Sequence, residues 1–234
     1  VGLRPDLRLV HYCFAGVPSL ASVVAQLWQP GWAANLYLWG DSGTGKTHLL
    51  QACILAAEER GLDTRYLSGA DLSTCQAADL ELLLDGAEQC DLVCVDDLEA
   101  ISVSSAMAVA LFHFHNRLMA GGGRLLIGAA VSPRYLCCGL EDLRSRLQQS
   151  MVFHLIPLSD QHKQAVLVAR ARQRGMLFTD EVVDFIMSRS ERSMMSLMRL
   201  LDRLDQASLN AKRRITIPFV KQIMTWQEPA IPSQ

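Results

Sequence analysis

One segment of the sequence has the residue types and spacing of a phosphate-binding loop. Residues 40–47 read Gly-Asp-Ser-Gly-Thr-Gly-Lys-Thr, which fits the pattern G-x-x-x-x-G-K-[ST]. Glycines allow successive backbone N–H groups to point at one anion, and the helix that follows adds the positive end of its dipole. In this pattern Lys46 reaches the outer phosphates, and the hydroxyl of Thr47 ligates Mg²⁺. The residues expected to bind nucleotide phosphates are Gly40, Asp41, Ser42, Gly43, Thr44, Gly45, Lys46 and Thr47.

A pair of acidic residues completes the predicted site. The apolar run 92–95 ends in Asp96 and Asp97. In α/β folds an acidic residue at the end of a buried strand lies at the carboxyl end of the sheet, where ligands bind. We expect Asp96 to hold Mg²⁺ through water and Asp97 to polarise the attacking water. The predicted cofactors are ADP or ATP with Mg²⁺, and these residues do not distinguish between the two nucleotides.

Three arginines have the chemistry to act on a transferring phosphoryl group. A guanidinium stabilises the charge on such a group from its own subunit or from a neighbouring one. Arg144 and Arg146 precede the last predicted strand, and Arg192 opens a predicted helix. Spacing alone favours a solvated surface position for each of them.

These residues need a scaffold, and the sequence predicts one. Apolar runs predict strands at 36–39, 64–68, 92–95, 125–127 and 151–155. Amphipathic stretches between them predict helices at 46–60, 77–88 and 105–119. The second of these helices has one apolar face, made of Leu80, Leu83, Leu84 and Ala87. Strands that are apolar on both sides and alternate with helices predict a parallel sheet covered on both faces.

After residue 157 the strand-like runs stop. Helical spacing and helix caps predict four helices, at 159–174, 179–188, 192–210 and 216–226. The predicted fold class is α/β, with a parallel five-stranded sheet flanked by helices and followed by a small all-helical domain. We expect an α/β domain at 1–157, the helical domain at 158–226 and a C-terminal tail at 227–234.

Composition excludes several classes of protein. The 234 residues have a formal net charge of −2, and 50% are hydrophobic and 20% charged, which excludes a disordered chain. Residues 1–158 carry a net charge of −6 and residues 159–234 one of +4. Apolar runs stay below the roughly 18 residues of a membrane span, so we expect no membrane contact. The seven cysteines contain no C-x-x-C spacing, which favours reduced thiols in a cytoplasmic protein.

Six segments carry a resemblance to a known family. They are LYLWGDSGTGKTHLL at 36–50, LVCVDDLE at 92–99, FHFHNRL at 112–118, LEDLRSRL at 140–147, LLDRLDQAS at 200–208 and RITIPFVKQI at 214–223. From about Phe14 to Trp226 the sequence resembles the AAA+ module of the bacterial replication initiator DnaA. The last two segments are similar to the short DnaA paralogues known as Hda. The resemblance implies an AAA+ P-loop domain followed by a helical lid domain.

The resemblance also implies roles for two of the arginines. The family's arginine finger falls on Arg146 and acts on nucleotide held by a neighbouring subunit. The family's sensor II arginine opens a lid helix and falls on Arg192, which would contact the phosphates of the chain's own nucleotide. The implied function is a regulator that docks on DnaA–ATP, promotes its hydrolysis and so inhibits DNA replication initiation. Such a protein activates hydrolysis by DnaA and is not itself a robust ATPase.

Further partners follow from the same resemblance. Hda-type proteins bind the DNA polymerase III sliding clamp through an N-terminal peptide, which would lie ahead of Val1. Because the sequence begins without Met, we expect a native stretch there. The helix-turn-helix domain of DnaA has no counterpart in this sequence, so we expect contact with DNA to be indirect or weak. The sequence leaves open whether the protein forms a homodimer.

Two departures from the family pattern keep alternatives open. Many Hda sequences have a degraded phosphate loop, whereas residues 40–47 are complete. DnaA has an Asp in the sensor I segment after the fourth strand, where Ala130 stands here, and this implies slow hydrolysis by the chain itself. The complete loop favours an alternative, a self-contained ATPase of the helicase-loader or transposition-helper type that acts on DNA. A purely structural adaptor on the sliding clamp is the second alternative.

Overall fold

The computed structural model describes residues 7–29, 31–32, 34–191, 193–211 and 215–225. The chain folds as two compact units, Val1–Pro157 and Leu158–Gln234. No helix within the described ranges is both long and apolar enough to cross a membrane.

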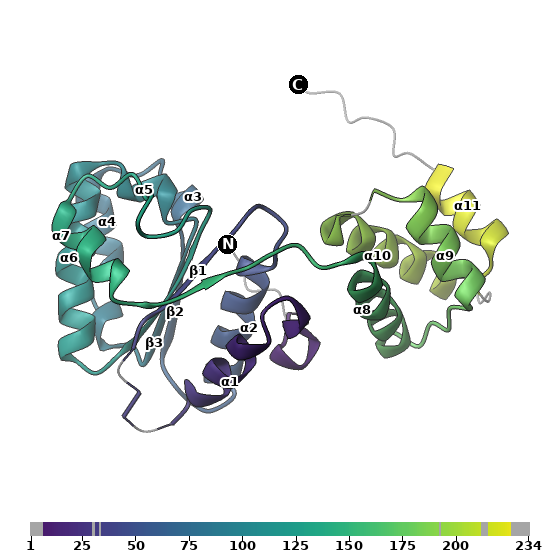
Figure 1. The fold of residues 1–234 in the computed structure, drawn as a ribbon, viewed down its shortest axis with the longest axis horizontal. Coiled ribbons are helices and arrows are strands. Elements are labelled where there is room, and N and C mark those ends of the chain that lie inside the picture. The colour runs from purple at the N-terminus through teal and green to yellow at the C-terminus, as the bar shows by residue number, and fades with distance from the viewer. Residues whose placement is uncertain (1–6, 30, 33, 192, 212–214, 226–234) are drawn as a thin grey trace. The chain divides into compact units, whose positions relative to one another are not determined.

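The first unit is built on a five-stranded parallel sheet (Figure 1). Its strands are β1 (Leu36–Trp39), β2 (Thr64–Ser68), β3 (Leu92–Asp96), β4 (Arg124–Ala129) and β5 (Met151–His154). Their order across the sheet is β2-β3-β4-β1-β5. Because every pairing is parallel, the segments that follow β1, β3 and β4 meet at the carboxyl end of the sheet. This confirms the predicted fold class.

One face of the sheet is covered by α1 (Pro18–Gln26) and α2 (Lys46–Glu58). The residues of β1 alternate between the faces, as a strand requires. Leu36 and Leu38 join the cluster under α1 and α2, whereas Tyr37 joins the cluster on the opposite face. The helix α1 is not among the predicted elements.

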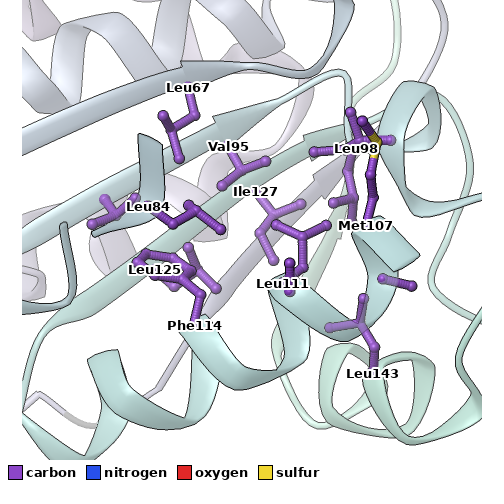
Figure 2. Close-up of a cluster of buried hydrophobic side chains, with 14 of the residues drawn as sticks. Leu67, Leu84, Val95, Leu98, Met107, Leu111, Phe114, Leu125, Ile127 and Leu143 are labelled. Atoms are coloured by element: carbon purple, nitrogen blue, oxygen red, sulfur yellow. The ribbon is translucent and has the colours of Figure 1, made fainter. Parts of the chain in front are cut away.

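The other face is covered by further helices and one short 3₁₀ segment. They are α3 (Gly69–Leu72), α4 (Ala77–Leu84), the 3₁₀ turn Ala87–Gln89, α5 (Glu99–Ser102), α6 (Ser105–Ala120) and α7 (Glu141–Gln148). Figure 2 shows Phe114 and Leu111 of α6 with Val95 of β3 and Ile127 of β4 in this cluster. The cluster also includes Leu143 of α7, which anchors that helix to the first unit.

The second unit is a small bundle of helices. They are α8 (Asp160–Gln173), α9 (Asp180–Arg189), α10 (Met194–Ala211) and α11 (Ile217–Thr225). The hydroxyl of Ser159 accepts a hydrogen bond from the backbone N–H of His162 and so caps α8. Its core includes Ile186 of α9 and Leu201 of α10.

Two local expectations from the sequence are wrong. The helix predicted over 77–88 ends at Leu84, because Gly86 adopts a φ of +80° and a separate 3₁₀ turn follows. Leu83, placed on the apolar face of that helix, is 45% exposed. The last strand is not covered on both faces, since β5 forms an edge of the sheet and its Val152 is exposed.

Candidate nucleotide-binding site

The segment 40–47 forms a glycine-dependent turn between β1 and α2. Gly40, Gly43 and Gly45 have φ angles of +151°, +81° and +98°, which side-chain-bearing residues rarely adopt. A Cβ on Gly40 would also lie 2.2 Å from the carbonyl oxygen of Leu155. The glycines therefore allow the backbone to turn directly from the carboxyl end of β1 into the first turn of α2.

Lys46 begins α2 and is almost buried, with 8% of its surface exposed. Its Nζ donates hydrogen bonds of 2.6 Å to the carbonyl oxygen of Gly40 and 3.0 Å to that of Asp41. Thr44 donates a side-chain hydrogen bond of 2.8 Å to the same Asp41 carbonyl. An ammonium group has three donors, so Lys46 can keep both loop contacts and still bind a phosphate oxygen. The loop holds the positive charge at the N-terminus of a helix, where anions bind.

Asp96 ends β3 and is the most enclosed carboxylate of the site, with 1% of its surface exposed. Its Oδ2 accepts hydrogen bonds from the hydroxyl of Thr47 at 2.6 Å and from that of Tyr66 at 2.9 Å. Its Oδ1 accepts the backbone N–H of Asp97 at 3.1 Å. A buried carboxylate requires such donors, because an unpaired buried charge is costly.

The space for this carboxylate is provided by Gly128 on β4. A Cβ there would lie 2.3 Å from Oδ1 of Asp96 and 2.9 Å from a methyl group of Leu50. The hydroxyl of Thr47 and the carboxylate of Asp96 are both oxygen ligands, which Mg²⁺ prefers. The part of the chain that is described holds no group of three or more His, Cys, Asp or Glu residues suited to a metal. The two oxygen ligands, Thr47 and Asp96, fit Mg²⁺, which takes most of its ligands from phosphates and water.

Asp97 follows Asp96 in an unusual backbone conformation. Its φ is +51°, a left-handed value that no other described residue except glycines adopts. A Cβ on Gly69 would lie 2.2 Å from the carbonyl oxygen of Asp97, so this bend also depends on a glycine of the neighbouring α3. Burial raises the pKa of Asp97, and the nearby charges of Asp96 and Glu99 raise it further.

The position that the resemblance to DnaA assigns to sensor I follows β4. The backbone N–H of Ala130 donates a 3.0 Å hydrogen bond to Oε2 of Glu99 on α5. The residues just before them are joined by a backbone hydrogen bond, in which the N–H of Leu98 donates to the carbonyl oxygen of Gly128 at 3.0 Å. Glu99 thus holds the backbone at a position where Ala130 has no polar side chain of its own.

Arg146 lies on the exposed side of α7. Leu143 and Leu147 of the same helix are buried and anchor it. Arg144 is held by an ion pair with Glu141, with 2.6 Å between Nη2 and Oε2. Among the described residues the guanidinium of Arg146 has no carboxylate partner of this kind. The structure therefore distinguishes two arginines that spacing alone could not.

The position of α7 puts Arg146 near the amino end of the sheet. The helix ends shortly before Met151, whose N–H donates to the carbonyl oxygen of Asn35, just ahead of β1. His115 on α6 lies 2.9 Å from the side chain of Asn35; burial lowers the pKa of His115, and the charge of Arg146 lowers it further. Lys46 follows the opposite, carboxyl end of β1.

The structure thus brings Lys46, Thr47, Asp96 and Asp97 together and leaves Arg146 apart from them. Arg192 lies outside the described residues. Sequence reasoning did not find Tyr66, Glu99 or Gly128. Tyr66 lies in a predicted strand, but its link to Asp96 depends on β2 being the neighbour of β3, which no local pattern indicates.

Two family models match the chain. Residues 17–154 match the bacterial DnaA ATPase domain, and residues 160–224 match the Hda lid domain.

Solved structures with the same fold come from several bacterial proteins. Domain III of the replication initiation protein DnaA from Thermotoga maritima aligns with a TM-score of 0.79 at 19% identity, covering 96% of this chain and 98% of that one. AMPPCP-bound DnaA from Aquifex aeolicus aligns with a TM-score of 0.73 at 22% identity, covering 91% of this chain and 70% of that one. The Thermotoga maritima RuvB Holliday junction branch migration motor aligns with a TM-score of 0.70 at 21% identity, covering 95% of this chain and 72% of that one. At these identities the likeness shows the fold alone.

Proposed function

The chain belongs to the DnaA-related AAA+ family, close to Hda, and we propose that it is a nucleotide-binding regulator of bacterial replication initiation. It binds ADP or ATP with Mg²⁺, docks on ATP-loaded DnaA and promotes hydrolysis of the nucleotide that DnaA holds. By converting DnaA–ATP to DnaA–ADP it inhibits initiation. The observation that carries this proposal is the position of Arg146, on an exposed helix face at the other end of the sheet from Lys46.

Nucleotide binding is supported by the geometry of the loop. Lys46 and the backbone of 40–47 bind the phosphates, with the helix dipole of α2 behind them. Thr47 and Asp96, already joined by a hydrogen bond, would hold the Mg²⁺, the hydroxyl directly and the carboxylate through water. The metal neutralises phosphate charge when bound. Arg192 lies outside the described residues, and the sensor II role that the family resemblance assigns to it stays a prediction.

Action on a partner's nucleotide is supported by the contrast between Arg144 and Arg146. Arg144 is already held by Glu141, whereas Arg146 is exposed and can be presented to a neighbouring subunit. A guanidinium donates hydrogen bonds to the oxygens of a transferring phosphoryl group and stabilises their negative charge. The contact with DnaA is then a head-to-tail interface between different surfaces. The opposite net charges of residues 1–158 and 159–234 suit such an interface.

The remaining partners belong to the same proposal. As Hda-type proteins do, it reaches its site of action through the DNA polymerase III sliding clamp, and it contacts DNA only indirectly or weakly. It acts in the cytoplasm, where DnaA and the clamp are found, alone or as a homodimer.

A second candidate is favoured by one observation, the complete and assembled set of Lys46, Thr47 and Asp96. A self-contained ATPase that acts on DNA would use this set for its own turnover. The short carboxylate at Asp97 and the apolar side chain of Ala130 weaken that case. The rate of the chain's own hydrolysis separates the two candidates.

The proposed function is tested by loading DnaA with labelled ATP, adding this protein with clamp-loaded DNA, and following the conversion to ADP. The experiment uses the full-length protein. Faster conversion than with DnaA and clamp-loaded DNA alone supports the regulator. An unchanged rate contradicts it.

A further inference from the structure

We propose that Tyr66 is a positioning residue for the magnesium ion, acting through Asp96. The inference rests on the nucleotide-binding part of the proposed function. The hydroxyl of Tyr66 donates a 2.9 Å hydrogen bond to Oδ2 of Asp96, the oxygen that also accepts from Thr47 at 2.6 Å. Three elements, α2, β2 and β3, thus converge on one carboxylate oxygen.

The number of acceptor positions on Asp96 explains why the hydrogen bond from Tyr66 affects how the carboxylate can meet the metal. An ionised carboxylate has about four lone-pair positions. The hydroxyls of Thr47 and Tyr66 occupy two on Oδ2, and the backbone N–H of Asp97 occupies one on Oδ1. One acceptor position, on Oδ1, is left for a hydrogen bond from a metal-bound water. Tyr66 therefore restricts the direction in which the carboxylate meets the metal.

Thr47 cannot do this alone. Its hydroxyl has two tasks, because its oxygen would ligate Mg²⁺ while its proton goes to Asp96. Tyr66 has no second task at the metal, and its ring comes from a different strand. Its hydroxyl is itself held by a hydrogen bond with the side chain of Gln51, which is buried one turn after Thr47 on α2.

The far side of the carboxylate is equally restricted. A Cβ on Gly128 would lie 2.3 Å from Oδ1 of Asp96, so only glycine leaves the carboxylate in this orientation. Tyr66 on β2 and Gly128 on β4 thus flank Asp96 from the strands on either side of β3. A disturbance on either side is expected to turn the carboxylate away from the metal.

The test is the affinity for a fluorescent ADP analogue, measured once in EDTA and once over a series of Mg²⁺ concentrations. We expect Tyr66→Phe to leave binding in EDTA unchanged and to raise the Mg²⁺ concentration for half-maximal effect by roughly tenfold, the size expected when a partner of a metal ligand is lost. Gly128→Ala is a second variant with the same expected result. In an Asp96→Asn background, Tyr66→Phe is expected to change the Mg²⁺ requirement no further.

The matched control is Tyr37→Phe. Tyr37 is a buried tyrosine on β1, and its hydroxyl donates a 3.0 Å hydrogen bond to the carbonyl oxygen of Val131, away from Asp96. This variant loses a phenol hydroxyl from the same sheet, and we expect its Mg²⁺ requirement to match that of the wild type.

Distinct outcomes overturn the inference and the proposed function. If Tyr66→Phe keeps the wild-type Mg²⁺ requirement, or weakens binding equally in EDTA and Mg²⁺, Tyr66 has no positioning role. If the wild type binds the analogue under neither condition, the nucleotide-binding function fails and the inference fails with it. Thermal melting of each variant identifies those that do not fold, and the Gly128 and Tyr66 variants are then interpreted separately.

Discussion

Arg146 and Lys46 lie at opposite ends of the same parallel sheet. Arg146 is on α7, which leads into the amino end of β5, whereas Lys46 follows the carboxyl end of β1. At about 3.3 Å per residue, the four residues of β1 separate these ends by roughly 13 Å. This separation allows Lys46 to serve the chain's own nucleotide while Arg146 is presented to a neighbouring subunit.

Lys46→Ala is expected to weaken ADP and ATP binding about ten- to a hundredfold. The variant removes the ammonium that the loop carbonyls hold beside the phosphates, a charge-assisted contact of about 1.5–3 kcal/mol. Titration with a fluorescent adenine nucleotide measures the change. Lys163→Ala is the control, since that lysine is paired with Asp160 on the second unit. Equal affinities in wild type and Lys46→Ala would contradict the assignment of the loop.

Hydrolysis of ATP by the chain alone is expected to be slow. Asp97 is shorter than the glutamate usual at this position in AAA+ proteins, and Ala130 offers no side-chain donor at the sensor position. Release of labelled phosphate from ATP, without DnaA, measures the rate. Turnover of about 1 s⁻¹ or more, in the range of many enzymes, that is lost in Asp97→Asn supports the self-contained ATPase instead.

Neighbouring leucines on α4 are expected to differ sharply in their effect on stability. Leu84 is completely buried and Leu83 is 45% exposed. Leu84→Ala should lower the free energy of unfolding by about 2–5 kcal/mol, and Leu83→Ala by about 0.5 kcal/mol or less. Urea unfolding followed by tryptophan fluorescence reports mainly on the first unit, which contains Trp28, Trp32 and Trp39, three of the four tryptophans. Similar losses in both variants would show that the helix extends past Leu84 with both leucines packed.

His115 is expected to make the first unit sensitive to acid. Burial lowers the pKa of His115, and the charge of Arg146 lowers it further. The unfolded chain then binds a proton at this histidine more readily than the folded chain does. The contribution of His115 to the free energy of unfolding is therefore fully present above the ordinary histidine pKa of about 6.5, and it is lost as pH falls towards the lower pKa of the folded state.

Urea unfolding between pH 8 and pH 5 tests this dependence. His115→Gln should lose less stability over this range than the wild type does. His113→Gln is the matched control, because His113 is exposed on the same helix and its replacement should leave the slope with pH unchanged. An unaltered slope in His115→Gln would assign the acid sensitivity to other groups.

The sequence predicted those parts of the site whose geometry is local. The phosphate loop depends on glycines and on the helix that follows, and both lie within one short segment. The meeting of Thr47 with Asp96 was predictable as well, since residues that follow parallel strands share one end of the sheet. The predicted strands and helices of the first unit lie close to the observed ones for the same reason.

What the sequence could not predict depends on neighbours in space. Tyr66 contacts Asp96 only because β2 pairs with β3, and strand order has no local pattern. Leu83 fits the helical period, but the glycine at 86 ends the helix before that face can be completed. Arg144 and Arg146 are alike in spacing, and the ion pair with Glu141 that separates them is a side-chain contact.

An arginine at position 146 is required by the proposed chemistry. A lysine there would keep the charge but lack the planar fork that reaches two oxygens at once. Arg146→Lys is therefore expected to behave like Arg146→Ala when hydrolysis by DnaA is measured. Full activity of the lysine variant would indicate that only charge is needed.

The most direct test of the account compares Arg146→Ala with Arg144→Ala in the conversion of DnaA-bound ATP to ADP on clamp-loaded DNA. An arginine finger supplied by a neighbour accelerates hydrolysis by about 10³–10⁵ in GTPases. We expect Arg146→Ala to lose the acceleration while it binds its own ADP as the wild type does. Arg144→Ala, which removes an arginine paired with Glu141 on the same helix, should keep the acceleration. Wild-type acceleration by Arg146→Ala would contradict the account.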